Sequence, residues 1–474
     1  MDKVSIHWFR RDLRLDDNPS LQFAAQNGAV TPIFILDTVN NTQKEFNLGE
    51  ASAWWLHHSL KSLNESLDKK INFFKGDPIE IIENIINDYD VESFSWNRCY
   101  SPWEIKRDTK IKSFLKDKDI NVKTFNSSLL WEPWEILKDD DTPYKVFSPF
   151  YRKGCLKKHA GPRQVVESNQ NLEPNNQKIS DKSIDELELL AKFPWHDKLI
   201  EHWNVGENAA MEKYMNFSKE GLNGYKDGRN FPSYPNVSVL SPHLHFGEIS
   251  PHQIWYHDKT KSAPDRDVLH FHSELGWREF SYYLIYHFPD MCTDNLNKKF
   301  DKFPWGHNDD FLKAWQEGKT GYPIVDAGMR QLWQTGYMHN RVRMIVASFL
   351  VKNLLIDWRK GLEWFNDCLC DADLANNTAS WQWTAGSGAD AAPYFRIFNP
   401  ILQGKKFDPD GDYTKHFVPE LKNFPSKYLF APWEAEEEVF TEAGIDYGKD
   451  YPKPIVSIEE SRDIALKAYD KIKG

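Results

Sequence analysis

The stretch VSIHWF at Val4–Phe9 is followed at Thr31–Leu36 by a second run of the same type, TPIFIL. Short runs rich in Val, Ile, Phe and Trp predict strands, and three more follow, INFF at Ile71–Phe74, SFSW at Ser93–Trp96 and NVKTF at Asn121–Phe125. Segments between them, such as Glu50–Leu67, have the periodicity of helices. This alternation predicts a doubly wound α/β domain with a parallel sheet. No GxGxxG motif follows the first strand, so the usual dinucleotide fingerprint is absent.

The chain changes character after these strands. Residues from about 160 to 205 are polar, rich in Asn and Gln, and aperiodic, which is typical of a long inter-domain connection. Helical patterns dominate beyond it, as in Ile324–Trp358, which is interrupted near Gly336. We therefore predict an α/β domain at residues 1–130, a linker at 131–205 and an all-α domain at 206–474.

The segment DADLANNTASWQWTAGSGADAAPYFRIFNP at Asp371–Pro400 is the strongest functional signal. Asp373, Asn377 and Trp381 are spaced four residues apart, so on a helix they would form one stripe. An acid, an amide and an indole on one face suggest a pocket for a polar, planar ligand. The same pattern also fits a helix that is capped by Asp371 or Asp373 and carries a core Trp further along.

A second constellation comprises Tyr225-Lys-Asp-Gly-Arg229 and the following Ser238 and Ser241. An aromatic ring, a cation and hydroxyls near a turn suit a phosphate or pyrophosphate. An ordinary surface turn would have the same composition.

Two further motifs contain arginines. In SELGWREF at Ser273–Phe280, Glu274 and Arg278 are i,i+4 partners that predict an exposed ion pair, with Trp277 beside them. In YMHNRVRM at Tyr337–Met344, Arg343 is a candidate partner for Asp371 or Asp373. A solvated basic helix face is the alternative for this motif.

The overall charge limits the possible partners. The 474-residue chain has 59 Lys and Arg against 70 Asp and Glu, a net charge of −11, which argues against a generic binder of polyanions. Residues 321–360 nevertheless contain six cations and two acids, which predicts a local basic patch. Five scattered cysteines without zinc-site spacing indicate reduced thiols, and no apolar run reaches membrane-spanning length. We expect a soluble, monomeric, cytoplasmic protein.

Taken together, these motifs resemble the photolyase/cryptochrome family, most closely the bacterial photolyases that repair cyclobutane pyrimidine dimers. The resemblance extends from WFRRDLRLDDNPSL at Trp8–Leu21 beyond NPILQGKKFDPDG at Asn399–Gly411, and includes EGKTGYPIVDAGMRQL and MHNRVRMIVASFLVK. It implies FAD, folded into a U shape, in the helical domain. The positions that match the usual flavin contacts are Tyr225, Ser238, Ser241, Arg278, Asp371, Asp373 and Asn377. Asn377 matches the residue that faces flavin N5, and Asp371 with Arg343 matches a salt bridge beside the ring.

The same resemblance implies how the protein would work. Trp381, Trp358 and Trp305 match a chain of three indoles that carries an electron from the surface to the excited flavin. The positions that match the pocket for a flipped-out dimer are Glu274, Trp277, Asn340, Arg341, Met344 and Trp383. Arg229, Arg341 and Arg396 are expected to hold phosphates of UV-damaged DNA. The implied reaction is light-driven electron transfer to the dimer, which opens the cyclobutane ring and then returns the electron.

Several positions depart from the family pattern. The flavin-phosphate stretch, usually T-S-R-L-S, is Val237-Ser238-Val239-Leu240-Ser241 here, so one hydroxyl and one cation are missing. Phe271 replaces a usual Trp beside the flavin. Trp103-Glu104 stands where folate-binding relatives often have Asn-Glu, so Glu104 is a candidate contact for an antenna chromophore. We expect methenyltetrahydrofolate rather than 8-hydroxydeazaflavin there.

Two other activities compete with dimer repair. A cryptochrome photoreceptor would share the flavin and the indole chain, but usually has a long C-terminal tail beyond the family core. A (6-4) photolyase would carry paired catalytic histidines where this chain has Met338-His339-Asn340. We therefore predict a cyclobutane-dimer photolyase first, a cryptochrome second and a (6-4) photolyase third.

Overall fold

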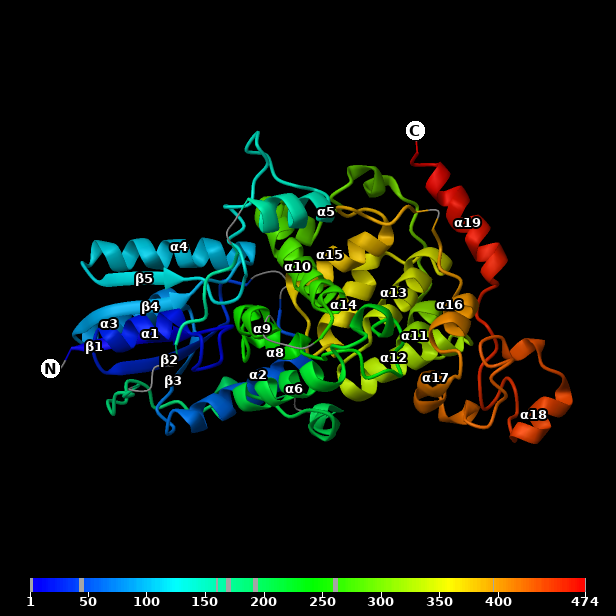
Figure 1. The fold of residues 1–474 in the computed structure, drawn as a ribbon, viewed down its shortest axis with the longest axis horizontal. Helices are drawn as coiled ribbons and strands as arrows, with labels where there is room; N and C mark the ends of the chain where they lie inside the picture. Colours follow the sequence, from blue (N-terminus) through cyan, green and yellow to red (C-terminus); the bar gives the residue numbers. More distant parts are fainter. Residues whose placement is uncertain are drawn as a thin grey trace. The chain divides into compact units, whose positions relative to one another are not determined.

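The computed structural model describes residues 3–41, 47–158, 161–167, 172–190, 195–258, 263–394 and 396–473. It divides into two compact units (Figure 1). The first unit comprises residues 1–223, 238–289 and 370–375, and the second comprises residues 224–237, 290–369 and 376–474. Parts of the predicted linker, residues 159–160, 168–171 and 191–194, lie outside the described residues. The domain limits of 1–130, 131–205 and 206–474 stay a prediction, because they follow sequence patterns rather than contacts.

The first unit contains a parallel five-stranded sheet in the order β3-β2-β1-β4-β5. Its strands are β1 (Val4–Phe9), β2 (Val30–Asp37), β3 (Asn72–Gly76), β4 (Val91–Asn97) and β5 (Asn121–Phe125). All five predicted strands and the doubly wound α/β class are therefore confirmed. The order reverses beside β1, and the carboxyl ends of β1 and β4 meet at such a switch point, where open α/β sheets bind ligands.

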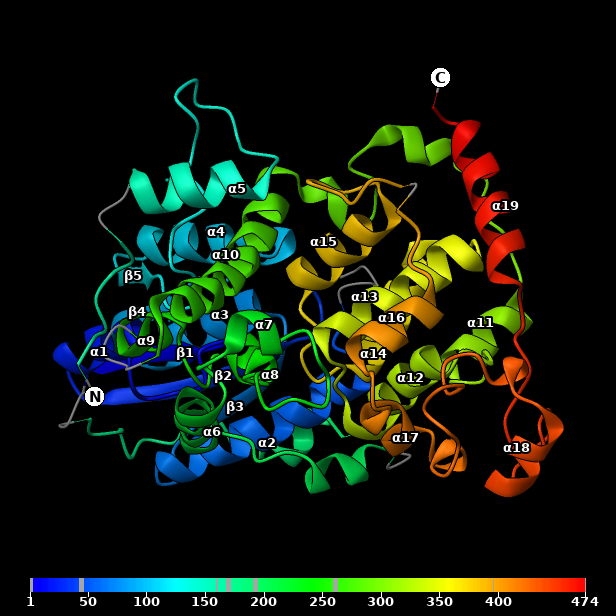
Figure 2. The same cartoon turned by 45° about the vertical axis from the view of Figure 1, so that its right-hand side comes forward.

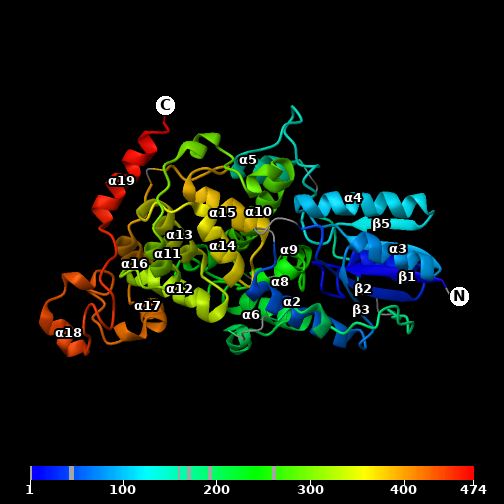
Figure 3. The same ribbon diagram turned by 180° about the vertical axis from the view of Figure 1, so that it is seen from behind.

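Helices cover both faces of the sheet. Ile82 and Ile85 of α3 (Pro78–Asp88) pack with Ile111 and Leu115 of α4 (Pro102–Asp117) in one hydrophobic core with Ile6, Trp8 and Phe94 of the strands. The opposite face meets α1 (Pro19–Gln26), where Ser20 Oγ lies 3.0 Å from the His7 ring Nδ1 and accepts or donates according to the tautomer. Both α1 and α3 begin with an Asn or Asp cap followed by Pro, a common helix start. Figure 3 shows α4 running along β5 at the edge of the sheet.

Helices beyond the sheet belong to the same unit. They are α2 (Glu50–Ser66), α5 (Phe147–Pro149), the π-helix η2 (Phe150–Lys157), α6 (Glu207–Glu220), α8 (Ser241–Phe246), α9 (Pro251–Asp258) and α10 (Asp265–His287). The 3-10 turns η3 (Asp185–Leu187) and η4 (Trp195–Glu201) interrupt the predicted linker. The predicted helix at Glu50–Leu67 is confirmed by α2.

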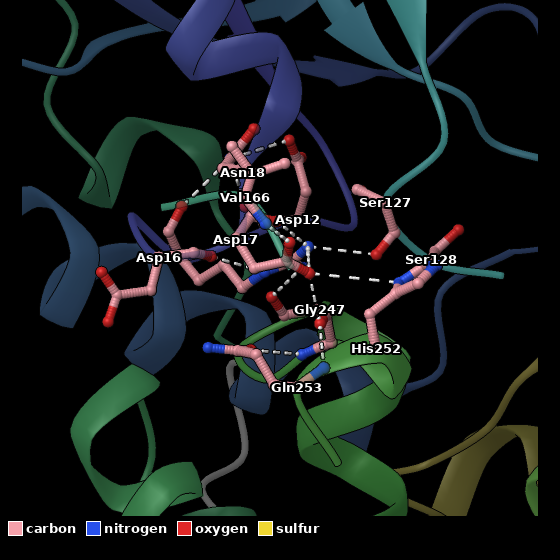
Figure 4. A network of polar contacts seen from close by, with 12 residues as sticks. Asp12, Asp16, Asp17, Asn18, Ser127, Ser128, Val166, Gly247, His252 and Gln253 are labelled. Carbon is pink, nitrogen blue, oxygen red and sulfur yellow. Dashed lines mark hydrogen bonds and ion pairs between the residues drawn. The ribbon is translucent and has the colours of Figure 1, made fainter. Parts of the chain in front are cut away.

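Asp17 and Arg14, in the loop after β1, form buried hydrogen bonds with residues next to α9 and α8 (Figure 4). Its carboxylate accepts hydrogen bonds from Ser250 Oγ at 2.5 Å and from Arg163 Nη1 at 2.6 Å. Arg14, in the same loop after β1, donates to the carbonyls of Gly247 at 2.8 Å and Ser127 at 3.0 Å. All of these acceptors are buried or nearly so, and a buried polar group without a partner is costly. This network explains why the first unit includes residues well beyond the sheet.

The second unit is helical, as predicted. Its helices are α7 (Tyr225–Gly228), α11 (Asp309–Gln316), α12 (Pro323–Thr335), α13 (Asn340–Ser348), the π-helix η7 (Phe349–Asn353), α14 (Trp358–Cys368), α15 (Leu374–Ala385, from residue 376), α16 (Pro400–Phe407), α17 (Asp412–Phe417), α18 (Glu437–Ala443) and α19 (Ile458–Asp470). Figures 1 and 2 both show α12 beside α13, α16 and α17. The predicted interruption near Gly336 is confirmed, because Gly336 ends α12 in the left-handed conformation. The short turns η5 (Pro289–Cys292), η6 (Lys298–Lys302), η8 (Pro419–Leu421) and η9 (Pro432–Glu434) connect the helices, η5 beginning at the last residue of the first unit.

Candidate functional site

A buried carboxylate, Asp373, is the centre of a polar cluster in the first unit. Its Oδ2 accepts a hydrogen bond from the Tyr282 hydroxyl, lies 3.3 Å from His245 Nδ1, and is 3.8 Å from Arg11 Nη1. Burial opposes the charge, but the contacts with His245, Arg11 and Tyr282 hold the pKa of Asp373 well below its usual range. The predicted three-residue helical stripe is wrong at this end, because α15 begins at Leu374, one residue later.

Ser238 and Ser241 flank a strained turn. Val239 between them has a φ of +52°, a conformation that a β-branched side chain rarely adopts. Such strain persists where surrounding structure enforces it, and it is concentrated at ligand sites. Ser241 then begins α8. The phosphate cradle stays a prediction, and Val237, the residue before Ser238, is half-buried.

Tyr225 and Arg229 lie on the short helix α7 of the second unit. The Arg229 guanidinium carbon is 5.6 Å from the centroid of the buried Tyr225 ring, so the two side chains form a cation–π pair. The helix is preceded by Gly224 in the left-handed conformation. An added Cβ at Gly228 would lie 2.2 Å from Asn236 Oδ1, so this turn is closely packed.

Arg278 on α10 departs from its predicted pairing. Its Nη1 donates to the Ser128 carbonyl at 2.6 Å and lies 3.4 Å from Glu279 Oε1, so the predicted pair with Glu274 is wrong. The i,i+4 spacing on the helix permitted that pair, but the carbonyl of a segment 150 residues away offers a fixed acceptor. Phe271, one turn of the same helix earlier than Leu275, is buried against Phe217 with ring centroids 4.9 Å apart.

Trp277 on α10 has an aromatic partner that no sequence pattern indicated. Its indole stacks on Phe147 with centroids 3.8 Å apart and an interplanar angle of 12°. The Glu274 carboxylate, one turn earlier, is 3.9 Å from His270 Nε2 and stays partly exposed. Phe147 lies in the segment expected to be linker, where Tyr144, Phe150 and Tyr151 are also aromatic and nothing in the sequence marks Phe147 as the partner of Trp277. A polar tip and a fixed aromatic platform on one helix face suit recognition of a planar, hydrogen-bonding ligand.

Trp381, Trp358 and Trp305 all lie in the second unit. Trp381 on α15 and Trp358 on α14 are buried, whereas Trp305 is only partly buried. An added Cβ at Gly361 would lie 2.0 Å from Trp381 Cη2, so α14 passes directly beside that indole. Trp358 is three residues before Gly361 and therefore on the same face of α14.

Backbone contacts join the segment that carries Trp305 to the segment that precedes Trp358. Gly306 N–H donates to the Leu355 carbonyl at 2.8 Å, and Gly306 bridges Ile356, two residues before Trp358. Trp305 precedes that bridge directly. Leu355 adopts a φ of +53° there, so the turn that pairs these segments is strained. The predicted indole chain is thus compatible with the geometry, and each assigned role stays a prediction.

Asn377 is fixed by its own amide on α15. Its Nδ2 donates to the Leu362 carbonyl at 3.3 Å, which orients the amide relative to α14. Trp383, on the same helix, is partly buried and points to a different side, since it is six residues further along. Asp371 is buried in the first unit, while Arg343 of the second unit donates to the Met338 carbonyl at 2.7 Å. The Asp371–Arg343 salt bridge stays a prediction.

Arg341 on α13 is held by three neighbours in the second unit. Its guanidinium carbon lies 4.4 Å from the Phe407 ring centroid, Nη2 donates to Asn230 Oδ1, and Nη1 is 3.7 Å from Met344 Sδ. Asn340 before it is exposed. These contacts hold a cation and a thioether together on one face of the helix, as a binding surface for an anionic or aromatic ligand requires.

The basic patch expected over residues 321–360 is smaller than its charge count. Arg330 forms an ion pair with Glu420 at 2.7 Å, and Lys360 lies 3.4 Å from Glu363. Both acids lie outside the counted segment, so a local count overestimates the net charge. Lys352 is buried and donates to the Arg396 carbonyl at 3.2 Å, which leaves the Arg396 side chain exposed.

Glu104 lies at the carboxyl edge of the sheet, in the first turn of α4. Its Oε1 is 3.8 Å from Arg11 Nη2, and its buried Oε2 has no hydrogen-bond partner among the described residues. Burial opposes the charge, but Arg11, Arg107 and Arg10 lower the pKa of this carboxyl. Arg107 stacks on both Trp8 and Trp103 at 5.0 Å from each centroid. An ionised, buried oxygen without a donor is a plausible contact for a ligand N–H.

No helix among the described residues is long and apolar enough to cross a membrane. No group of three or more His, Cys, Asp or Glu side chains in the described ranges could hold a metal ion. The five cysteines are buried and free, as predicted.

Comparisons with known proteins decide the family. The protein-family model for DNA photolyase matches residues 5–171, and the protein-family model for the FAD-binding domain of DNA photolyase matches residues 271–471. A deoxyribodipyrimidine photo-lyase of Agrobacterium fabrum is 45% identical over 479 residues, which cover 99% of this chain and 98% of that protein. The chain belongs to the DNA photolyase family. It therefore carries the FAD-binding domain of that family, and the predicted family and flavin are confirmed.

Other photolyase-family relatives agree over the full length. A bacterial class III photolyase from Agrobacterium tumefaciens has a structure that matches with a TM-score of 0.94 and 44% identity, over 100% of this chain and 98% of that one. Cryptochrome-2 of Arabidopsis thaliana is 37% identical over 490 residues, which cover 99% of this chain and 79% of that protein. The photolyases are thus the nearer of these relatives.

Proposed function

We propose that this photolyase-family protein uses light to repair cyclobutane pyrimidine dimers in UV-damaged DNA. The observation that carries the proposal is that three indoles lie in one unit, with Trp381 and Trp358 buried and Trp305 only partly buried. A sequence of easily oxidised indoles that ends near solvent divides one long electron transfer into short ones.

FAD supplies light absorption and the electron for repair when it is bound. The residues that we propose to hold it are Tyr225, Val237, Ser238, Ser241, Phe271, Arg278, Arg343, Asp371, Asp373 and Asn377. Their chemistry fits this group: a strained turn with two serines suits a pyrophosphate, and a fixed amide suits the edge of a flavin ring. The lowered pKa of Asp373 favours its charged form, which accepts hydrogen bonds.

We propose that Glu274, Trp277, Asn340, Arg341, Met344 and Trp383 bind the flipped-out dimer. Photolyases take the damaged bases out of the stack, and a damaged base pair costs less free energy to unstack than an intact one. The Phe147–Trp277 stack supports an aromatic platform, and Glu274 is positioned to accept a hydrogen bond from a thymine edge. Arg229, Arg341 and Arg396 would contact phosphates. The electron given to the dimer breaks two carbon–carbon bonds and is then returned, so no net oxidation occurs.

His339 argues against (6-4) repair, the third candidate. Burial, together with the charges of Arg229 and Arg341, lowers the pKa of His339 to about 3, so the ring is neutral near pH 7. Its Nδ1 accepts the Arg341 backbone N–H as the cap of α13. A neutral capping imidazole is a poor proton donor. A cryptochrome remains the second candidate, since it would share the flavin and the indole chain.

We propose that an antenna chromophore binds at Glu104. We favour methenyltetrahydrofolate over 8-hydroxydeazaflavin, because the buried Glu104 Oε2 suits a pterin N–H and the neighbouring Trp103 offers a face for stacking. The absorption spectrum of the purified protein before and after addition of the folate tests this. We also propose a cytoplasmic monomer, on the basis of five free, buried cysteines.

The deciding experiment is repair of a thymine cyclobutane dimer in an oligonucleotide by the purified, reduced protein under blue light. Recovery of thymine absorbance in the light and none in the dark is the expected result. A parallel oligonucleotide with a (6-4) photoproduct should remain unrepaired. Absence of light-dependent recovery, with flavin bound, would instead favour a cryptochrome.

A further inference from the structure

The indole N–H of Trp358 has a buried hydrogen-bond acceptor that the proposed repair chemistry does not yet use. Trp358 Nε1 donates to Asn295 Oδ1 at 2.9 Å, and both residues are buried. Asn295 Nδ2 in turn donates to Asp301 Oδ1 at 2.9 Å. An ionised carboxylate only accepts hydrogen bonds, so Asp301 fixes the amide with its nitrogen outward and its oxygen toward the indole.

The segment that carries Asn295 is anchored by the neighbour of Trp381. Gln382 Nε2 donates to the carbonyls of Met291 at 2.7 Å and Asp294 at 2.9 Å. Its Oε1 accepts the Leu296 backbone N–H at 2.9 Å, and its side chain is buried. Since the three bonds hold the chain on both sides of Asn295, the amide has little freedom to leave the indole.

The identity of this acceptor matters because an oxidised indole is a much stronger acid than a neutral one. A carboxylate or imidazole beside it would take the N–H proton, whereas an amide oxygen is scarcely basic. A radical that loses its proton is neutral and can be reduced to the intact indole only when a proton returns, so the missing electron would be trapped on Trp358. An amide acceptor holds the indole in place without offering a proton site.

We infer that Asn295 is a positioning residue that keeps the N–H proton on Trp358 while this indole is oxidised, so that the positive charge passes on to Trp305. Trp358 loses one electron to oxidised Trp381 and gains one from Trp305. Trp305, which is partly exposed, then releases its proton to water. The inference rests on the proposed electron-transfer function of the three indoles.

The charge beside Trp358 acts in the same direction. The Arg359 guanidinium carbon is 4.6 Å from the Trp358 ring centroid. A cation over a neutral ring is favourable, but it raises the energy of the same ring once it is positively charged. Arg359 is itself paired with Asp357 at 3.0 Å, which reduces the repulsion without removing it. The positive charge is therefore better placed on Trp305 than on Trp358.

The test compares three flavin-loaded proteins that all carry Trp305→Phe, so that the positive charge stops at Trp358. The first has no other substitution, the second (the exchange variant) carries Asn295→Asp with Asp301→Asn, and the third carries Asp301→Asn alone. The exchange preserves the net charge and the number of hydrogen bonds but places a base on the indole N–H. Transient absorption after a light flash distinguishes a protonated from a deprotonated Trp radical.

In the two proteins that keep Asn295, we expect the protonated radical. Its decay should be the same in H2O and in D2O. The exchange variant should shift to the deprotonated radical, live longer and show a solvent isotope effect. A deprotonated radical in either protein that keeps Asn295 would overturn the inference. So would a protonated radical in the exchange variant.

A second readout needs neither light nor flavin. The indole resonance of Trp358 in ¹⁵N-Trp-labelled protein, assigned with Trp358→Phe, should show slow hydrogen exchange that becomes faster in Asn295→Leu. Unchanged exchange would show that the hydrogen bond is absent and overturn the inference. If this bond is present but no Trp radical forms in any protein, the proposed electron-transfer chain is wrong, and the inference falls with it.

Discussion

The indole of Trp381 occupies the space in which Gly361 would otherwise carry a side chain. A Cβ at Gly361 would lie 2.0 Å from Cη2 and 2.5 Å from both Cζ2 and Cζ3 of that indole. This close approach of α14 and α15 fixes Trp381 against the helix that carries Trp358. The absence of a side chain at one position therefore determines the spacing of two proposed electron carriers.

Replacement of this glycine should disturb both packing and electron transfer. We expect Gly361→Ala to lower the free energy of unfolding by about 1–3 kcal/mol, because the added methyl group forces the indole or the helix to move. Photoreduction of oxidised flavin should also slow. Urea unfolding and the rate of flavin bleaching under light measure the two effects. Glu363→Ala, on the exposed face of the same helix, is the control. It should change the free energy of unfolding by no more than about 0.5 kcal/mol, and the rate of photoreduction by no more than the factor to which that energy corresponds.

Trp381→Phe separates photoreduction from repair. Phe fills most of the space against Phe365, whose ring centroid is 5.0 Å away, but it is far harder to oxidise. We expect photoreduction of oxidised flavin to be lost, while protein reduced chemically beforehand still repairs dimers. Flash photolysis and the oligonucleotide repair assay give the two results. Normal photoreduction in this variant would remove Trp381 from the relay.

The five strands, the helix at Glu50–Leu67 and the interruption near Gly336 were predictable because their signals are local. Runs such as VSIHWF combine β-branched and aromatic residues over the length of one strand, and Gly336 marks a helix end by its backbone preference alone. The start of α15 was less predictable. Asp373 fits the helical spacing, yet its contacts with Tyr282 and His245 place it before the first turn.

Contacts between distant segments left no such signal. Asn295 is 63 residues from Trp358, and an asparagine in a polar loop has no feature that indicates an indole partner. Phe147 lay in a presumed linker, although it stacks on Trp277. Arg330 looked like part of a basic patch because its acid, Glu420, is 90 residues away. In each case the partner is chosen by tertiary packing, which local patterns do not encode.

Removal of the Glu274 carboxylate should impair repair without loss of the flavin. A hydrogen bond in a water-poor pocket contributes about 1–3 kcal/mol, so Glu274→Ala should lower the repair yield by about tenfold. Glu274→Gln retains an acceptor oxygen and should lose less. Repair yield per photon and bound flavin per protein chain are the measurements. Equal repair by Glu274→Ala and the unaltered protein would exclude Glu274 from the dimer pocket.

Arg396 and Arg341 should differ in their salt dependence. Arg396 has an exposed side chain, so Arg396→Ala should weaken DNA binding and reduce the slope of log K against log salt by about 0.9, one phosphate contact. Arg396→Lys should preserve the slope. Arg341→Lys keeps the charge but loses the planar stack on Phe407, so affinity should fall while the slope stays constant. Binding titrations at several salt concentrations with dimer-containing DNA provide the comparison, and an unchanged slope in Arg396→Ala would show that Arg396 contacts no phosphate.

Glu279 should make stability depend on pH near neutrality. Burial raises the pKa of this carboxyl from 4.5 to about 8, although the charge of Arg278 and the N–H groups of Leu130 and Trp131 act against the shift. The folded protein therefore keeps a proton that the unfolded chain loses, so the stabilisation is complete below about pH 4.5 and is lost as pH rises toward 8. A change of this size corresponds to at most about 5 kcal/mol.

The matched variant for this prediction is Glu279→Gln, which cannot ionise but keeps an acceptor for the backbone N–H groups of Leu130 and Trp131, now 2.8 and 3.3 Å from Glu279 Oε2. Denaturant unfolding between pH 5 and 9 should show that the unaltered protein loses stability relative to the variant up to about pH 8, and not beyond. A difference that grows in the opposite direction would mean that the folded protein holds Glu279 as a carboxylate. Arg278 and the two N–H groups would then outweigh burial, and the buried end of α10 would carry an ion pair rather than a neutral acid.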